Sequence, residues 1–203
     1  MIKHAGKPKK TIIMSSHAGQ LFPNKGQGHS FYMEMALKQA ASAFKQDEVP
    51  IGAVVIQGNA VVGRGYNQRE TLKDPTAHAE MIAITAAANT KGDWRLDDCI
   101  LYVTKEPCPM CAGAIVNSRL KMVVFGCYDE QEGCCGSLYQ LCGDPRFSTT
   151  VAVKGADFIE ERRDGSEFLV LDSGKLIPAR AIKFGRPHVR VGSSIGVIRY
   201  HNR

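Results

Sequence analysis

The sequence lacks any apolar run close to the roughly 18 residues that a membrane-spanning helix needs. Its basic N-terminus is followed by only a short apolar stretch, Ile12 to Met14, whereas a secretory signal needs about 7 to 15 apolar residues. We therefore expect no membrane segment and no secretory signal. The seven cysteines are an odd number, which argues against a disulfide framework and for a reducing, cytoplasmic location. Clustered cysteines there are metal ligands, catalytic thiols or buried apolar residues.

Acidic residues are missing from both ends of the chain. Residues 1–33 hold five Lys and residues 173–203 hold two Lys and five Arg, without any Asp or Glu. The overall charge of +6 therefore comes from two basic ends around an acidic body. Basic terminal arms are typical of nucleic-acid binding. On charge alone, however, solvated tails that keep the protein in solution are the better interpretation.

Composition divides the chain into three parts. Residues 1–28 are rich in Lys, Gly, Ser and Pro without periodicity, which predicts a flexible extension. Residues 29–155 carry the periodic apolar segments and are expected to form one domain. Residues 156–203 form a basic tail, of which residues 156–163 are briefly helix-like.

Hydrophobic periodicity and turn signals predict the elements of the domain. Strands are expected at residues 51–57, 60–66, 99–105 and 122–126 and near 150–154, the first two joined as a hairpin by Gly58-Asn59. Helices are expected at residues 29–45, from Asp74-Pro75 to about 89, within 107–118 and around 137–141. Strands that alternate with helices after an initial hairpin favour a three-layer α/β/α domain with a mixed central sheet.

Three segments combine residues that suit a zinc site. His78 lies in the opening turns of an expected helix, and Cys108 and Cys111 lie at the start of the next one. Two thiolates and a neutral imidazole balance the charge of Zn²⁺ and leave a fourth position for water, as catalytic zinc sites do. Glu80, two residues after His78, is near enough to exchange protons with that water.

Each of these residues also has an ordinary structural interpretation. A lone His near a helix start is usually structural, Cys-x-x-Cys also occurs as a redox pair or as buried thiols, and Glu80 alone would be a solvated helix charge. The combination is more specific, because H-x-E followed by P-C-x-x-C is the signature of zinc nucleobase deaminases.

The chain resembles the bacterial tRNA-specific adenosine deaminases over residues 29–155. The likeness rests on short motifs spread along this region. They are Glu48-Val49-Pro50-Ile51-Gly52-Ala53-Val54, Asp74-Pro75-Thr76-Ala77-His78-Ala79-Glu80, Leu101-Tyr102-Val103-Thr104, Glu106-Pro107-Cys108, Met110-Cys111-Ala112-Gly113-Ala114, Val124-Phe125-Gly126 and Gly136-Ser137-Leu138.

The resemblance implies a cytidine-deaminase-like fold, a homodimer, and deamination of the wobble adenosine in the anticodon loop of tRNA to inosine. It implies one zinc ion per chain held by His78, Cys108 and Cys111, with Glu80 as the proton shuttle. Asn67 and Asp129 match positions that contact or lie near the bound nucleotide. From the residues alone, a strand-end Asn and a solvated Asp would be the preferred interpretations.

The sequence departs from the family in several places. Lys105 stands where the family usually has an apolar residue, and Cys127-Tyr128 replace a small residue and an Arg. Cys134-Cys135 replace small residues and are expected to be buried. Two alternatives stay open: a free-base or nucleotide deaminase of the guanine or cytosine type, and a non-catalytic zinc- or RNA-binding paralogue.

Overall fold

The computed structural model describes residues 28–155 in full and, beyond them, only the backbone of five short strands. These strands form one sheet of order β6-β7-β8 and a β9–β10 pair. Their bounds are Ile159–Glu161 (β6), Glu167–Val170 (β7), Leu176–Pro178 (β8), Val189–Val191 (β9) and Ile198–Tyr200 (β10). Residues 156–163 were expected to be briefly helix-like, and this expectation is wrong for residues 159–161, which form strand β6. The other expectations for residues 1–27 and 156–203 lie outside the described residues.

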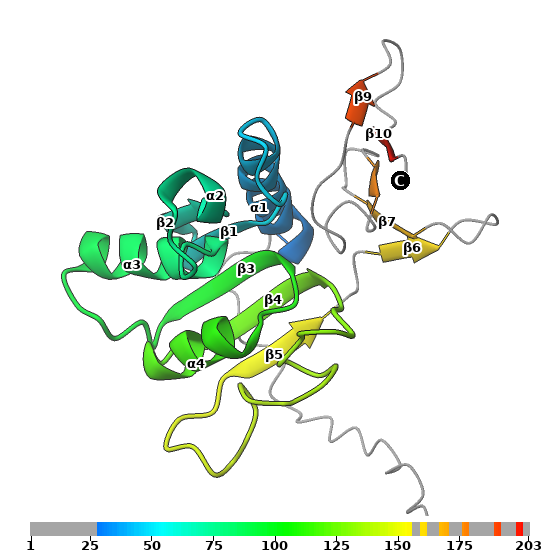
Figure 1. Ribbon diagram of the computed structural model, residues 1–203. Helices are drawn as coiled ribbons and strands as arrows, with labels where there is room; N and C mark the ends of the chain where they lie inside the picture. Colours follow the sequence, from blue (N-terminus) through cyan, green and yellow to red (C-terminus); the bar gives the residue numbers. More distant parts are fainter. Residues whose placement is uncertain are drawn as a thin grey trace, which may run out of the picture.

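A mixed five-stranded sheet forms the centre of the domain, in the order β2-β1-β3-β4-β5 (Figure 1). Strand β1 runs antiparallel to both β2 and β3, whereas β3, β4 and β5 are parallel to one another. The strands are Gly52–Gln57 (β1), Ala60–Tyr66 (β2), Cys99–Lys105 (β3), Met122–Cys127 (β4) and Ala152–Gly155 (β5). Because β3 and β4 are parallel, their carboxyl ends meet at the same edge of the sheet.

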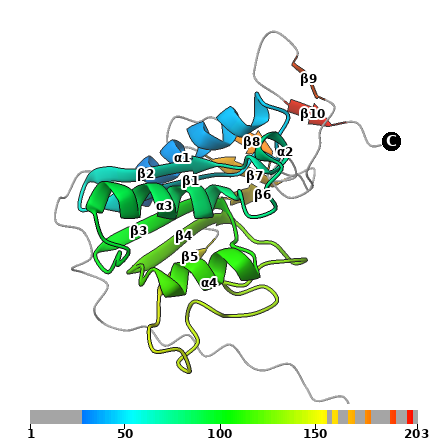
Figure 2. The ribbon, with the colours of Figure 1, turned by 60° about the vertical axis from the view of Figure 1, so that its left-hand side comes forward.

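Helices cover both faces of the sheet, so the expected three-layer architecture is confirmed (Figure 2). Helix α1, His29–Phe44, packs on Val54 and Ile56 of β1, whereas α3, Ala79–Lys91, and α4, Pro109–Asn117, lie on the face of Ala53 and Val55. The alternation along β1 follows from the two-residue period of a strand. A one-turn helix, α2 at Arg69–Leu72, comes between β2 and α3. None of the helices within residues 28–155 is long and apolar enough to cross a membrane.

The close packing of α3 on β2 fixes where that helix begins. Ala79, Ala83 and Ala87 recur every fourth residue and are fully buried. A Cβ atom added to Gly65 would lie 2.2 Å from the backbone oxygen of Ala79, so the helix approaches the strand more closely than any side chain would permit. The first turn of α3, which carries Glu80, is thereby held against the sheet.

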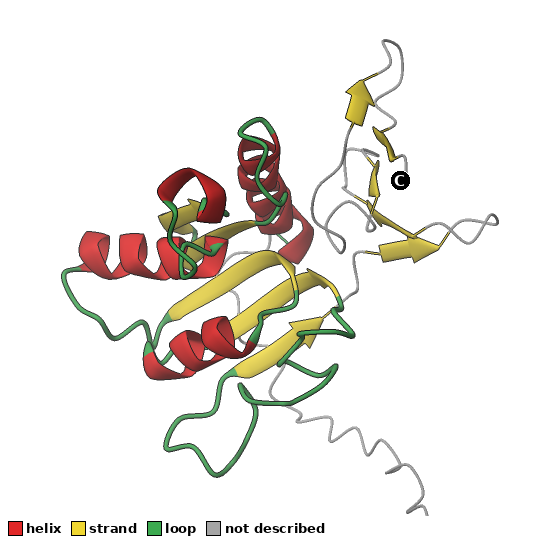
Figure 3. Ribbon diagram, viewed as in Figure 1, coloured by secondary structure: helices red, strands yellow, loops and turns green. Residues whose placement is uncertain are grey.

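Two expected elements differ from the structure (Figure 3). Helix α3 begins at Ala79 rather than at Asp74-Pro75, because the Asp74 carboxylate accepts the Thr76 N–H at 2.7 Å and closes a separate turn. Residues 137–141 form turns and an isolated bridge instead of a helix. Their backbone N–H groups bond elsewhere: that of Ser137 donates to the Glu106 carboxylate at 2.9 Å.

Candidate active site

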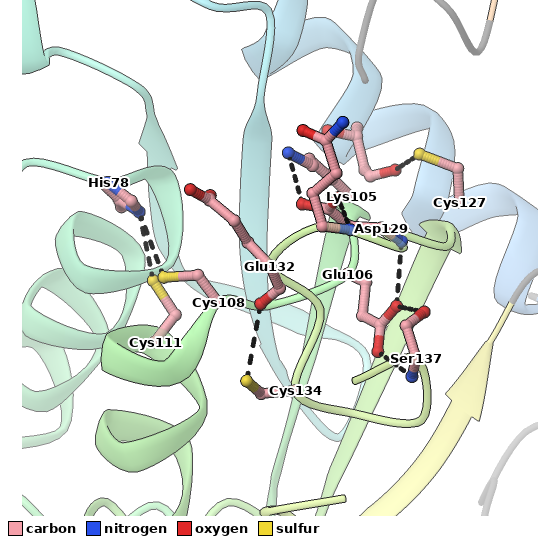
Figure 4. Close-up of polar contacts among 12 residues, drawn as sticks. His78, Lys105, Glu106, Cys108, Cys111, Cys127, Asp129, Glu132, Cys134 and Ser137 are labelled. Carbon is pink, nitrogen blue, oxygen red and sulfur yellow. Dashed lines mark hydrogen bonds and ion pairs between the residues drawn. The ribbon is translucent and has the colours of Figure 1, made fainter. Parts of the chain in front are cut away.

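The three expected metal ligands come together at the starts of two helices (Figure 4). His78 is the N-cap residue of α3, Cys108 is the N-cap residue of α4, and Cys111 lies in the first turn of α4. One ligand atom from each residue lies within 4.8 Å of the other two. Pro109 occupies the first position of α4, where no backbone N–H is needed, and thus defines the start of the helix between the two cysteines.

The spacing of these ligand atoms fits a tetrahedral zinc ion. The Nδ1 atom of His78 lies 3.7 Å from the Sγ atom of Cys108 and 3.5 Å from that of Cys111. Zinc bonds of about 2.05 Å to nitrogen and about 2.3 Å to sulfur, at tetrahedral angles, place the two ligand atoms roughly 3.6 Å apart. One imidazole and two thiols are also ligands that zinc prefers. The donor set and its spacing therefore suit the metal that the sequence predicts.

The two thiols of the cluster have unequal acidity. Hydrogen bonds from Cys111 and His78 lower the pKa of Cys108 to about 4 against the opposing effect of burial. The pKa of Cys111 is raised, because its thiol donates to Cys108 and because it is buried near Glu80. The cluster therefore holds one thiolate readily, and a bound cation favours the second.

Glu80 lies in the first turn of α3, two residues from His78, and is only 4% exposed. Burial raises the pKa of its carboxyl group, and the neighbouring Cys108 raises it further, whereas His78 lowers it. A carboxyl group whose pKa is raised by burial takes up a proton more readily than an exposed one. Its position suits a proton shuttle.

Asn67, at the end of β2, is buried rather than exposed at a turn. Its Nδ2 atom donates to the Glu48 carboxylate at 3.1 Å, and its backbone N–H donates to the carbonyl of Ile51 at 3.0 Å. The next residue, Gln68, donates to the carbonyl of Ala77, the residue before His78. The backbone at Asn67 is thus tied to the segment that leads into the cluster.

Asp129 follows β4 and is paired with Lys105, which ends β3. The Nζ atom of Lys105 lies 2.7 Å from Asp129 Oδ2, and the two side chains are 15% and 8% exposed. Burial alone would raise the pKa of Asp129, but hydrogen bonds from Lys105 and from the Gln131 backbone hold it below its usual value. The lysine that departs from the family pattern therefore has a specific partner. That pairing could not be read from the sequence.

A buried carboxylate that the sequence did not single out organises the loop after β4. Glu106 accepts hydrogen bonds from the backbone N–H groups of Asp129, Cys135 and Ser137 at 2.9 to 3.0 Å, and from the Ser137 hydroxyl. A Cβ atom on Gly133 would lie 2.3 Å from its Oε2 atom, so the loop is wrapped tightly around the carboxylate. Cys134 and Cys135 are buried in this loop, as expected.

Replacement of Glu106 by alanine is expected to destabilise the domain by about 3–5 kcal/mol, because two buried N–H groups and one partly buried N–H group lose their acceptor together. Chemical denaturation of the zinc-loaded protein measures the change. Glu130→Ala, which removes an exposed carboxylate from the same loop, is the matched control and should change stability by less than about 0.5 kcal/mol. Equal effects of the two substitutions would contradict an organising role for Glu106.

Lys105→Met is expected to lower the free energy of unfolding by about 1–3 kcal/mol at neutral pH, because the buried Asp129 carboxylate loses its cation. The folded state lowers the pKa of Asp129 below 3.8, so this stabilisation is present above that pH and is lost as the pH falls through the folded-state value. Denaturation of metal-free protein at several pH values tests this. A difference in unfolding free energy between the parent and Lys105→Met that grows as the pH falls would contradict this expectation.

Comparison with known proteins agrees with this arrangement. The sheet order, the helix layers and the cluster define a deaminase of cytidine-deaminase-like fold. The chain belongs to the MafB19-like deaminase family, which it matches over residues 27–153.

Individual relatives within this class are tRNA enzymes. The chain is 46% identical over 130 residues to the tRNA-specific adenosine deaminase of Bacillus subtilis, an alignment that covers 64% of this chain and 81% of that protein. It is 39% identical over 132 residues to the same enzyme of Streptococcus pyogenes, covering 65% and 83%. A solved structure from studies of A-to-I editing by tRNA:A34 deaminases at the wobble position is 39% identical, with a TM-score of 0.59 over 62% of this chain and 91% of that one.

Proposed function

We propose that the protein catalyses the hydrolytic deamination of the wobble adenosine in the anticodon loop of a tRNA, which yields inosine and ammonia. The observation that carries the proposal is the cluster of His78, Cys108 and Cys111 with the buried carboxylate of Glu80 beside it. The tRNA-specific relatives support adenosine in tRNA as the substrate, in preference to a free base.

In this proposal His78, Cys108 and Cys111 hold one zinc ion per chain. The ion supplies a Lewis-acidic centre that makes water nucleophilic near neutral pH. Glu80 takes a proton from the attacking water and delivers it to N1 of the adenine ring. It then takes the second proton and transfers it to the amino nitrogen at C6, which leaves as ammonia. Water and adenosine thus balance inosine and ammonia, and the carboxyl group is regenerated.

The wobble base has to leave the anticodon stack before these residues can reach it. We assign Asn67 and Asp129 to the binding of the extruded nucleotide. Asn67 lies beside the segment that precedes His78, and Asp129 lies at the edge of the sheet where β3 and β4 end. We further propose that the protein acts in the cytoplasm as a homodimer. Exposed apolar side chains on one segment, Leu138, Tyr139 and Phe147, support a contact between subunits.

The test is incubation of zinc-loaded protein with an anticodon stem-loop that carries adenosine at the wobble position, followed by digestion and detection of inosine. We expect inosine at that position alone, and no ammonia release from guanine, cytosine or cytidine. Release from a free base without inosine in the stem-loop would favour a free-base deaminase. Zinc and RNA binding without either product would indicate a non-catalytic paralogue.

A further inference from the structure

Glu48 is a fully buried carboxylate that the proposed mechanism does not use. It precedes β1 and is 2% exposed. It accepts the backbone N–H of Thr71 at 2.6 Å, the backbone N–H of Glu70 at 3.2 Å and the side-chain Nδ2 of Asn67 at 3.1 Å. Burial alone would raise the pKa of Glu48, but these backbone donors outweigh it and lower the pKa below its usual value. The group that faces Asn67 is therefore an ionised carboxylate.

An ionised carboxylate only accepts hydrogen bonds, and this determines how the Asn67 amide is turned. The amide has to present its nitrogen to Glu48, because the reverse orientation would set two oxygens against each other. Its carbonyl oxygen, Oδ1, then points away from Glu48. The backbone on both sides of the amide is also held, by the bonds from Asn67 to Ile51 and from Gln68 to Ala77. Asn67 thus has a fixed place beside the segment that leads into the cluster, and a fixed polarity.

We propose that Glu48 is a positioning residue that makes Asn67 present a hydrogen-bond acceptor, its Oδ1 atom, to an N–H or O–H donor of the bound nucleoside. This inference rests on the proposed function, since it takes Asn67 as a residue that contacts the substrate. It adds the polarity of that contact and the residue that sets it. Without Glu48 the amide is free to turn and to offer a donor where the nucleoside needs an acceptor.

Exchange of the two functional groups tests the proposal. In Glu48→Gln one oxygen has to serve the three donors that Glu48 accepts, the Thr71 N–H, the Glu70 N–H and the Asn67 amide, so Asn67 is no longer held in one orientation. In Asn67→Asp two carboxylates face each other. In the double variant Glu48→Gln/Asn67→Asp, the Gln amide donates to the Asp carboxylate and the second Asp oxygen again faces the nucleoside as an acceptor. The net charge of the double variant equals that of the parent.

We expect each single substitution to lower kcat/KM on the stem-loop by about 10–100-fold, the effect of one mispaired buried group. The double variant should be about tenfold more active than Asn67→Asp, because neighbouring groups that act together are not additive. It should stay below the parent, because one of the backbone N–H groups of Glu70 and Thr71 still lacks its acceptor. Rates are compared per zinc-loaded molecule, at a temperature below every unfolding midpoint, so that a loss of stability alone does not lower them.

The matched control is the same exchange of amide and carboxylate at a second amide–carboxylate pair, far from the site. Gln57 Nε2 donates to Asp98 Oδ2 at 2.7 Å on the exposed surface, at the end of β1 opposite the cluster. The exchange Gln57→Glu/Asp98→Asn and both of its single substitutions should leave kcat/KM within about twofold of the parent, as surface changes away from the site do.

Three outcomes overturn the inference. Single variants with parental kcat/KM but lowered unfolding midpoints would make the pair structural only. A double variant as impaired as Asn67→Asp would show that the nucleoside needs the donor of Asn67, not its acceptor. A parent that forms no inosine in the stem-loop would overturn the proposed function as well, whereas the first two outcomes leave the proposed function standing.

Discussion

Replacement of Glu80 by alanine is expected to reduce turnover on the stem-loop by about 10²–10⁴-fold, the range for loss of a general acid–base group. The carboxyl group is buried in the first turn of α3 beside the cluster, but Glu80 is not one of the three residues that are proposed to bind zinc. Zinc content and affinity for the stem-loop should therefore remain close to those of the parent. Single-turnover rates, metal analysis and equilibrium binding on the same preparation separate these quantities.

Two further variants make this test specific. Glu80→Gln keeps the size of the side chain but cannot carry the proton, so it should be as slow as Glu80→Ala. Glu70→Ala removes a carboxylate that also lies in the first turn of a helix, but one that is 58% exposed, and should have parental turnover. Turnover of Glu80→Ala within about threefold of the parent would exclude the shuttle, because general acid–base catalysis accounts for larger factors.

Strands were the most predictable elements of the fold, and β2 and β3 have the bounds that were expected. The bounds expected for β3, Cys99 to Lys105, are those observed, because both of its faces are buried and its sequence is a continuous β-forming run. The start of α3 was misplaced because Asp74-Pro75 is equally a turn signal, and the turn formed. The helix expected at residues 137–141 does not form, because the Ser137 N–H donates to the buried Glu106 and the N–H groups of Leu138 and Leu141 donate to the carbonyls of Gly133 and Cys134.

The candidate site, like the fold, was predictable only in part from the sequence. The residues of the cluster were recognised because zinc needs particular side chains at particular spacings, and such requirements are visible in a sequence. Glu48 and Glu106 were missed as organising groups because their partners are mostly backbone N–H groups, which every residue except proline has. The partner of Lys105 was likewise unpredictable, since the contact depends on the parallel pairing of β3 with β4.

Cys108→Ala is expected to abolish both inosine formation and the response of the protein to zinc. Ligands that bind only the folded state stabilise it by RT ln(1 + [L]/Kd), which is about 2.7 kcal/mol at a hundredfold excess over Kd. With Cys108 removed, only one imidazole and one thiol of the three protein ligands remain. The unfolding midpoint of the variant should therefore change little when zinc is added or chelated.

Cys99→Ala is the control for the loss of a buried thiol as such. Cys99 is fully buried at the start of β3, away from the cluster at its far end, so this variant should be less stable but should keep the parental zinc response. Thermal unfolding with added zinc and with chelator, together with metal analysis, compares the three proteins. A Cys108→Ala protein that still bound one zinc ion per chain and formed inosine at the parental rate would remove Cys108 from the metal site. The proposed ligand set of one histidine and two cysteines would then be wrong, because zinc would have to be held without the thiol that begins α4.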